Sequence, residues 1–86
     1  MAVNDVKGVV TGVAELQGII YAVCKDSKAI QSYKTDDCFT RQRDIPVSGL
    51  QDACDVVACL GKLRLYVADQ QGIWVVSPLS HKVSLR

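Results

Sequence analysis

Short apolar runs separated by turn residues divide the chain into eight expected strands. Residues 19–24 are apolar throughout, and the run is short enough for a strand that is buried on both faces. Polar turn residues follow at 25–28 and again at 69–72. Residues 39–43 alternate poorly and are polar apart from Phe39, as in an exposed outer strand. We expect Pro46 to end that strand because proline cannot donate to a central ladder. The expected strands are 9–16, 19–24, 29–34 and 38–45, then 53–59, 63–69, 73–77 and 82–85.

The pattern of the first half recurs in the second half with a period near 44 residues. The matching segments are 13–16 with 57–60, 20–23 with 65–68, and 29–30 with 73–74. A repeat of about 40–45 residues is typical of one four-stranded propeller blade. Each copy begins with a strand of small apolar residues, continues with two buried strands and ends with a polar one, as a blade does from the axis outwards.

The fold class that follows is all-β, with two four-stranded antiparallel propeller blades. Blade 1 covers residues 3–47, and blade 2 covers 48–86 with a slightly truncated outer strand. An alternative interpretation is a small two-sheet sandwich in which the repeat is a coincidence.

Two blades are too few to close a ring, so a complete propeller would need several chains. The hydrophobic fraction of the chain favours such an association. Of the 86 residues, 49% are hydrophobic, which is more than a small independent sheet needs. Open apolar flanks favour association, and head-to-tail contacts close a ring when the rotation allows. The sequence therefore predicts a homotrimer of six blades, with a tetramer of eight as the lesser option. The residues expected to pack between blades or chains are Val13, Leu16, Ile20, Tyr21, Val57, Leu60, Leu65, Tyr66 and Trp74.

Residues 65–75, Leu-Tyr-Val-Ala-Asp-Gln-Gln-Gly-Ile-Trp-Val, resemble the second and third strands of an NHL-type propeller repeat. Residues 55–58 with Gly61 and Lys62 resemble the preceding strand and turn. In the first copy residues 20–24 stand at the motif, with Cys24 at the aspartate position, and the family's usual turn Asn is missing from both copies. The resemblance implies a six-bladed ring that binds proteins or ligands, and it implies no chemistry.

Net charge and hydropathy argue against a nucleic-acid partner, a signal peptide and a membrane span. Ten basic and nine acidic residues give a net charge of +1, so no basic face for nucleic acid is expected. The N-terminus lacks the apolar stretch of a signal peptide, and the longest apolar run, 19–24, is far too short to span a membrane. We expect a soluble chain that stays where it is made, cytoplasmic by default.

The chain has few groups that could carry chemistry. We expect Cys24, Cys38, Cys54 and Cys59 to be free structural thiols, with one or two disulfides as the alternative. Cys54 and Cys59 are five residues apart and fall on opposite faces of a strand, which argues against a metal pair. No metal or other cofactor is predicted.

Asp69 is predicted to cap its own turn, with a binding role at the ring mouth as the alternative. Tyr21, Tyr66 and Trp74 are expected to pack in the core, with ligand stacking as the alternative. The favoured function is a non-catalytic interaction scaffold that associates with itself. A carbohydrate- or ligand-binding, lectin-like module is the alternative. A metal-dependent propeller lyase is less favoured, because it needs several channel histidines and the chain has only His81.

Overall fold

The computed structural model describes residues 8–35, 40–80 and 82–86, and every regular element in these ranges is a β-strand. Within the same ranges no helix is long and apolar enough to cross a membrane. The strands are β1 (Val10–Leu16), β2 (Ile19–Cys24), β3 (Ala29–Lys34), β4 (Ile45–Pro46), β5 (Asp55–Cys59), β6 (Arg64–Ala68), β7 (Ile73–Ser77) and β8 (Lys82–Leu85).

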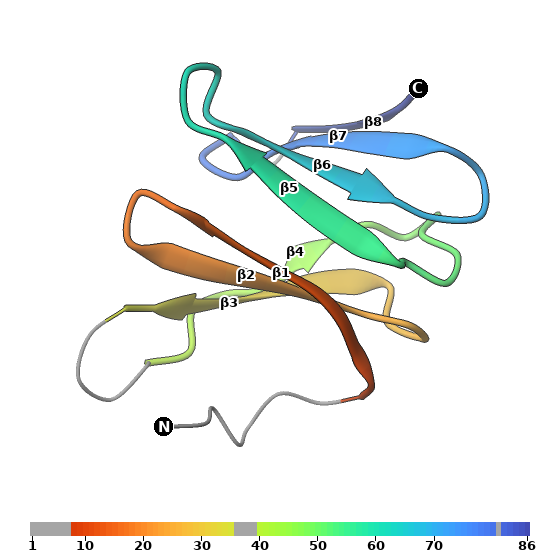
Figure 1. Cartoon of the computed structure of the whole chain (residues 1–86), viewed down its shortest axis with the longest axis horizontal. Helices are drawn as coiled ribbons and strands as arrows, with labels where there is room; N and C mark the ends of the chain where they lie inside the picture. Colours follow the sequence, from red (N-terminus) through yellow and green to blue (C-terminus); the bar gives the residue numbers. More distant parts are fainter. Residues whose placement is uncertain (1–7, 36–39, 81) are drawn as a thin grey trace.

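The strands form two separate antiparallel sheets in chain order (Figure 1). Sheet 1 is β1-β2-β3-β4 and sheet 2 is β5-β6-β7-β8. The tightest hairpin joins β1 to β2, where Gln17 and Gly18 have φ of 53° and 80° between the paired residues Leu16 and Ile19. Positive φ at both turn residues matches the twist of two-residue hairpins. The predicted all-β class with two four-stranded antiparallel sheets is confirmed.

The outer strand of sheet 1 differs from the prediction. An outer strand was expected over residues 38–45, but β4 contains only Ile45 and Pro46. Upstream, Gln42 N donates to Ser32 O at 2.8 Å, so the chain touches β3 twice with a bend between the contacts. Pro46 is the last residue of β4, where the strand was expected to end, and it also pairs with Ala29. Proline is tolerated there because β4 is an edge strand. Residues 38 and 39 lie outside the described ranges.

The two sheets meet most closely at their first strands. In Figure 1, β1 and β5 run side by side in the same direction, and both sheets extend away behind them. A Cβ atom at Gly12 would lie 2.9 Å from Asp55 Cα, so only glycine allows this approach. The Thr11 hydroxyl adds a link by donating to Ala53 O at 2.6 Å. The first strands of the two sheets therefore form the closest contact between the sheets.

A single core fills the space between the sheets. Alternation along each strand directs one set of side chains inward, such as Tyr21 and Val23 on β2 and Leu65 and Val67 on β6. The segment that joins the sheets contributes too, and its Leu50 is fully buried. The buried cluster comprises Leu16, Tyr21, Val23, Ile30, Ile45, Val47, Leu50, Ala53, Val56, Leu65, Val67 and Val76.

Candidate interaction surface

The nine residues predicted to pack between blades or chains fall into two groups. Leu16, Tyr21 and Leu65 are buried between the sheets, and Trp74 packs against the same core. The other five do not belong to the buried cluster. Val13 and Ile20 lie on the face of sheet 1 that points away from sheet 2, and Val57 and Tyr66 lie on the matching face of sheet 2, while Leu60 is exposed in the β5–β6 turn. We call these faces the outer face of each sheet.

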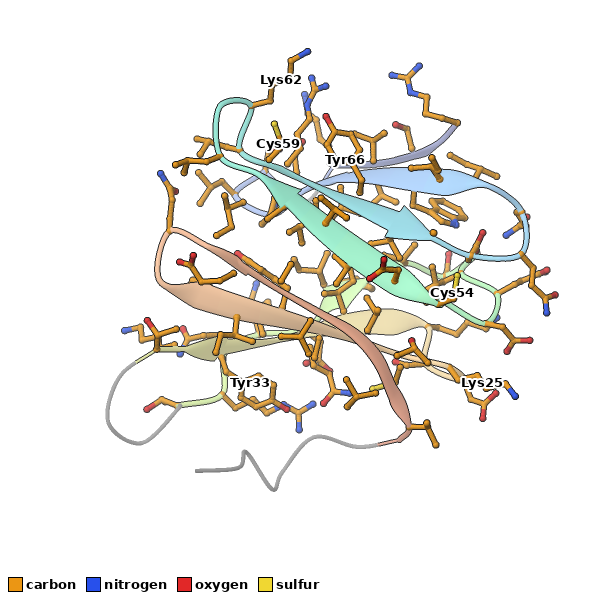
Figure 2. The ribbon with its side chains drawn as sticks, in the orientation of Figure 1. Lys25, Tyr33, Cys54, Cys59, Lys62 and Tyr66 are labelled. Carbon is orange, nitrogen blue, oxygen red and sulfur yellow. The ribbon has the colours of Figure 1, made fainter. Side chains whose placement is uncertain are left out.

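The outer face of sheet 2 carries an apolar centre. A row across the sheet joins Val57 to Tyr66, Tyr66 to Val75 and Val75 to Ser84. Val57 is 57% exposed, and Ile73, beside this row, is 49% exposed. Figure 2 shows Tyr66 on the side of sheet 2 that points away from sheet 1. Sheet 2 therefore presents unpaired apolar side chains to whatever approaches this face.

The outer face of sheet 1 is closed at its centre. Tyr33 is 1% exposed, and its hydroxyl donates to Gln31 Oε1 at 3.0 Å. The Gln31 amide donates in turn to Cys24 Sγ at 3.3 Å, and Gly8 lies against Cys24. Ala22 on the same face is also buried. We expected two open apolar flanks, and the structure shows that the flank on sheet 1 is covered at its second and third strands while Val13 on its first strand is 58% exposed.

The cysteines have contrasting surroundings. Cys24, Cys54 and Cys59 are free thiols, whereas Cys38 lies outside the described residues. Burial raises the pKa of the Cys24 thiol, and the hydrogen bond from Gln31 opposes this only in part. Cys54, which was expected to be a structural thiol, is not part of the buried core. It precedes β5 and is exposed, because its backbone N–H pairs with Ala68 O while the side chain faces solvent.

The Asp69 carboxylate accepts five hydrogen bonds, of which the longest runs from Gln71 Nε2 to Oδ2 at 3.5 Å. Its Oδ1 accepts from the backbone N–H groups of Gln71 (2.8 Å) and Gly72 (3.1 Å). This confirms the predicted turn cap. Its Oδ2 accepts from Gln51 N at 2.9 Å and from Trp74 Nε1 at 2.7 Å. Desolvation would raise the pKa of Asp69, but these hydrogen bonds outweigh it and lower the pKa to about 2.

The β6–β7 turn, which contains Asp69 and Gln71, is hydrogen-bonded to the segment that connects β4 to β5. Gln71 Nε2 donates to Gly49 O at 2.6 Å, and a Cβ atom at Gly49 would lie 2.9 Å from Trp74 Cη2. Trp74 thus rests on the Gly49 backbone with its indole N–H already paired. The ring is a structural element here, which disfavours the ligand-stacking alternative for Trp74.

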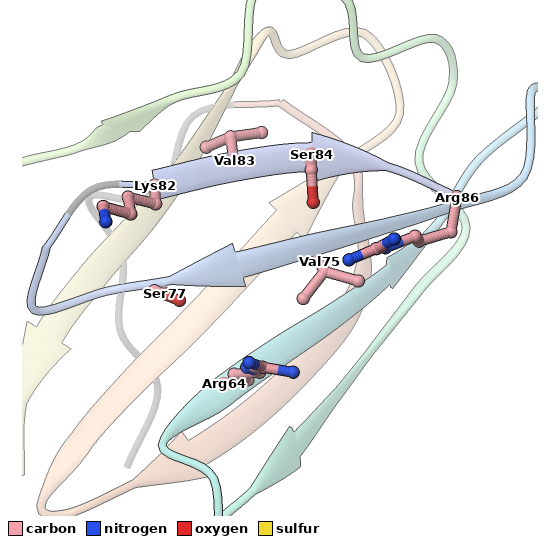
Figure 3. A pocket seen from close by; sticks show the side chains of 7 residues that line it. All are labelled: Arg64, Val75, Ser77, Lys82, Val83, Ser84 and Arg86. Atoms are coloured by element: carbon pink, nitrogen blue, oxygen red, sulfur yellow. The ribbon is translucent and has the colours of Figure 1, made fainter.

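A pocket of about 480 Å³ opens beside β7 and β8 on the outer face of sheet 2 (Figure 3). Sequence analysis did not single out its polar residues, because cations scattered over two strands look like ordinary solvent-facing positions. A smaller crevice of about 130 Å³ lies beside Tyr21 and Leu79. The lining residues of the larger pocket are Arg64, Val75, Ser77, Lys82, Val83, Ser84 and Arg86.

Groups that could hold a metal do not come together in the part of the chain that the structure describes. No cluster of three or more His, Cys, Asp or Glu side chains occurs there. His81 lies outside the described residues. Comparisons of the chain with family models, with curated proteins and with solved structures find no match.

Proposed function

We propose that the chain is a non-catalytic, self-assembling β-propeller fragment that serves as an interaction scaffold. The observation that carries the proposal is the open apolar centre of the outer face of sheet 2, with Val57 and Ile73 about half exposed. Full burial of each such side chain contributes about 1 kcal/mol. A partner that covers Val57, Tyr66 and Val75 together is therefore favoured over water.

The partner proposed is a second copy of the chain. Within one chain, sheet 1 and sheet 2 already stack with β1 beside β5 and bury a shared core. Repeating that step head to tail places the outer face of sheet 2 against the outer face of sheet 1 of the next chain. Val13, 58% exposed, and its neighbour Ile20 are the apolar side chains that receive it. Three chains give the six blades that the NHL-type resemblance implies.

The covered centre of sheet 1 sets a condition on this ring. In one arrangement Gly8 stays against Cys24, and the next chain contacts only Val13 and Ile20 beside the covered centre. In the other, Gly8 moves aside and the next chain covers Cys24. In both arrangements the outer face of sheet 2 on one chain meets the outer face of sheet 1 on the next chain, so the contact is heterologous. An isologous dimer through two copies of the sheet 2 face is the outcome that contradicts a ring.

Sedimentation velocity on a matched pair of variants tests the proposal. Val57→Asp puts a charge in the apolar row, and Leu79→Asp makes the same change at an exposed residue in the β7–β8 turn. We expect the unmodified chain and Leu79→Asp to sediment as trimers and Val57→Asp to sediment as a monomer. Equal behaviour of both variants, or a monomeric unmodified chain, contradicts the proposal.

A further inference from the structure

Three cationic side chains converge on the pocket beside β7 and β8. Arg64 comes from β6, Lys82 begins β8 and Arg86 follows β8. Arg86 is held in place by its backbone, because its N–H donates to Ile73 O at 2.8 Å and its C=O accepts from Ile73 N at 3.4 Å. Figure 3 shows Arg86 reaching along β7 towards Val75, with Arg64 on the neighbouring strand.

These cations lack an acidic counterpart among the described residues. The ion pair found among the described residues joins Arg41 to Asp44 and lies between β3 and β4 in sheet 1. Asp55 is the acidic residue on the described outer face of sheet 2, and it is at the opposite end of β5 from the residue paired with Arg64. Four residues along a strand span about 13 Å, and three strand spacings separate Asp55 from β8 by about 14 Å. Asp55 therefore neutralises neither arginine at close range.

We infer that this pocket binds a small molecule that carries a phosphate or sulfate group. Guanidinium groups match the geometry of tetrahedral oxyanions and donate two parallel hydrogen bonds to them. The hydroxyls of Ser77 and Ser84 are further donors on the pocket wall, and Val75 supplies an apolar floor for the carbon part of the ligand. A volume of about 480 Å³ holds a ligand of this kind.

The pocket is built by one chain, but Val75 also belongs to the face proposed to meet the next chain, so the ligand and a second chain compete for Val75. All seven lining residues come from sheet 2 and from residue 86 directly after it. Binding of an anion there relieves the mutual repulsion of three like charges, which is the electrostatic reason for affinity. Solvent screening limits that gain, so the affinity should fall as salt concentration rises.

Backbone amide shifts in NMR spectra test the inference on the unmodified chain. Inorganic phosphate, inorganic sulfate and acetate are added at matched ionic strength. Saturable shifts at Ser77, Val83 and Ser84 with a Kd below about 10 mM for phosphate or sulfate, and none for acetate, are the expected result. Tighter binding of phosphate than of sulfate identifies a phosphorylated ligand, and the reverse order a sulfated one.

Matched charge variants complete the test. Arg64→Gln and Arg86→Gln remove one guanidinium each from the pocket, whereas Lys62→Gln removes a cation from the β5–β6 turn outside it. We expect the arginine variants to weaken the Kd about tenfold or more. Lys62→Gln should leave it within about twofold. Spectra that retain the native pattern show that each variant is folded. Linear shifts without saturation, or equal weakening in all three variants, overturn the inference.

Discussion

Sheet 1 and sheet 2 share strand order and hairpin connections, yet they differ in what their outer faces expose. In sheet 1 the centre is covered and holds the buried chain of hydrogen bonds from Tyr33 through Gln31 to Cys24. In sheet 2 the equivalent positions of the second and third strands hold Tyr66 and Val75, which are only half-buried. The first strands do not differ, because Val13 and Val57 are exposed alike. The comparison teaches that a repeated strand pattern sets the scaffold, while the side chains on the outer face decide whether a blade is closed or available.

The turn that follows the second strand also differs between the two sheets, in the groups to which it is hydrogen-bonded. In sheet 2, Asp69 binds its own turn and also Gln51 and Trp74. In sheet 1, Cys24 is the last residue of β2 and is buried on the outer face. Ser27 organises that turn locally, where its Oγ accepts from Ala29 N at 3.2 Å. Both turns contact the segment between the sheets, but by different groups. In sheet 1 the Lys28 Nζ donates to Leu50 O and the Lys28 C=O accepts from Val47 N at 2.8 Å, whereas in sheet 2 the contact is made by the Asp69 carboxylate.

The largest expected effect comes from forcing the two sheets apart. Gly12→Val puts side-chain atoms where even a Cβ lies 2.9 Å from the backbone of Asp55 and Val56. We expect a loss of roughly 3 kcal/mol in the free energy of unfolding, measured by urea denaturation. Gly61→Val is the matched control, because a Cβ at Gly61 meets nothing within 4 Å. Equal losses in both variants would show that β1 and β5 do not approach in this way.

The next effect separates the two turns. Asp69→Ala removes the acceptor of five hydrogen bonds and leaves the Trp74 N–H unpaired. We expect it to destabilise the fold by roughly 2 kcal/mol, against about 0.5–1 kcal/mol for Ser27→Ala in the sheet 1 turn. Urea unfolding curves of the two variants measure the difference. Similar losses would contradict the assignment of Asp69 as a link between the sheets' connection and sheet 2.

The pH dependence of stability sharpens the same contrast. The pKa of Asp69 is lowered from 3.8 to about 2 in the fold, so the ionised carboxylate favours the folded state. Its contribution is complete above about pH 4 and is lost as the pH falls through about 2. Thermal unfolding from pH 5 to pH 2 should show this loss in the unmodified chain and a smaller one in Asp69→Asn. Parallel curves would contradict it.

The smallest effect is on chemical reactivity and reports the closed face of sheet 1. Cys24 is buried with a raised pKa, and Cys54 is exposed. Alkylation at pH 8, followed by peptide mass spectrometry, should modify Cys54 at least about tenfold faster than Cys24. The difference should vanish in denaturant, which supplies the control. Equal rates in the native protein would mean that Cys24 is not covered on the outer face of sheet 1.

Most strands could be predicted because each is a short apolar run bounded by turn residues. β2 begins and ends where the run 19–24 does, and β8 coincides with 82–85. The outer strand of sheet 1 could not be predicted in the same way, because its polar residues do not alternate with apolar ones. These residues contact β3 through separate hydrogen bonds, such as that from Gln42 N to Ser32 O. Tyr21 and Tyr66 match in the repeat, yet one enters the core and the other faces outward.

The site was less accessible to sequence reasoning than the fold. The turn cap of Asp69 follows from local chemistry, whereas its bond to Gln51 spans 18 residues and depends on how the connection folds back. The cationic pocket joins Arg64 on β6 to Lys82 on β8 and leaves no trace in a linear pattern. Such tertiary contacts depend on register and on the path of the loops, which hydrophobic periodicity does not specify.

The native mass in solution, measured by light scattering after size exclusion, tests the central claim most directly. Self-assembly through the open face of sheet 2 predicts one discrete species at three times the 9.4 kDa of a single chain. A compact species of 9.4 kDa at all protein concentrations would contradict the account, because it would mean that two stacked sheets with an exposed apolar face remain a monomer.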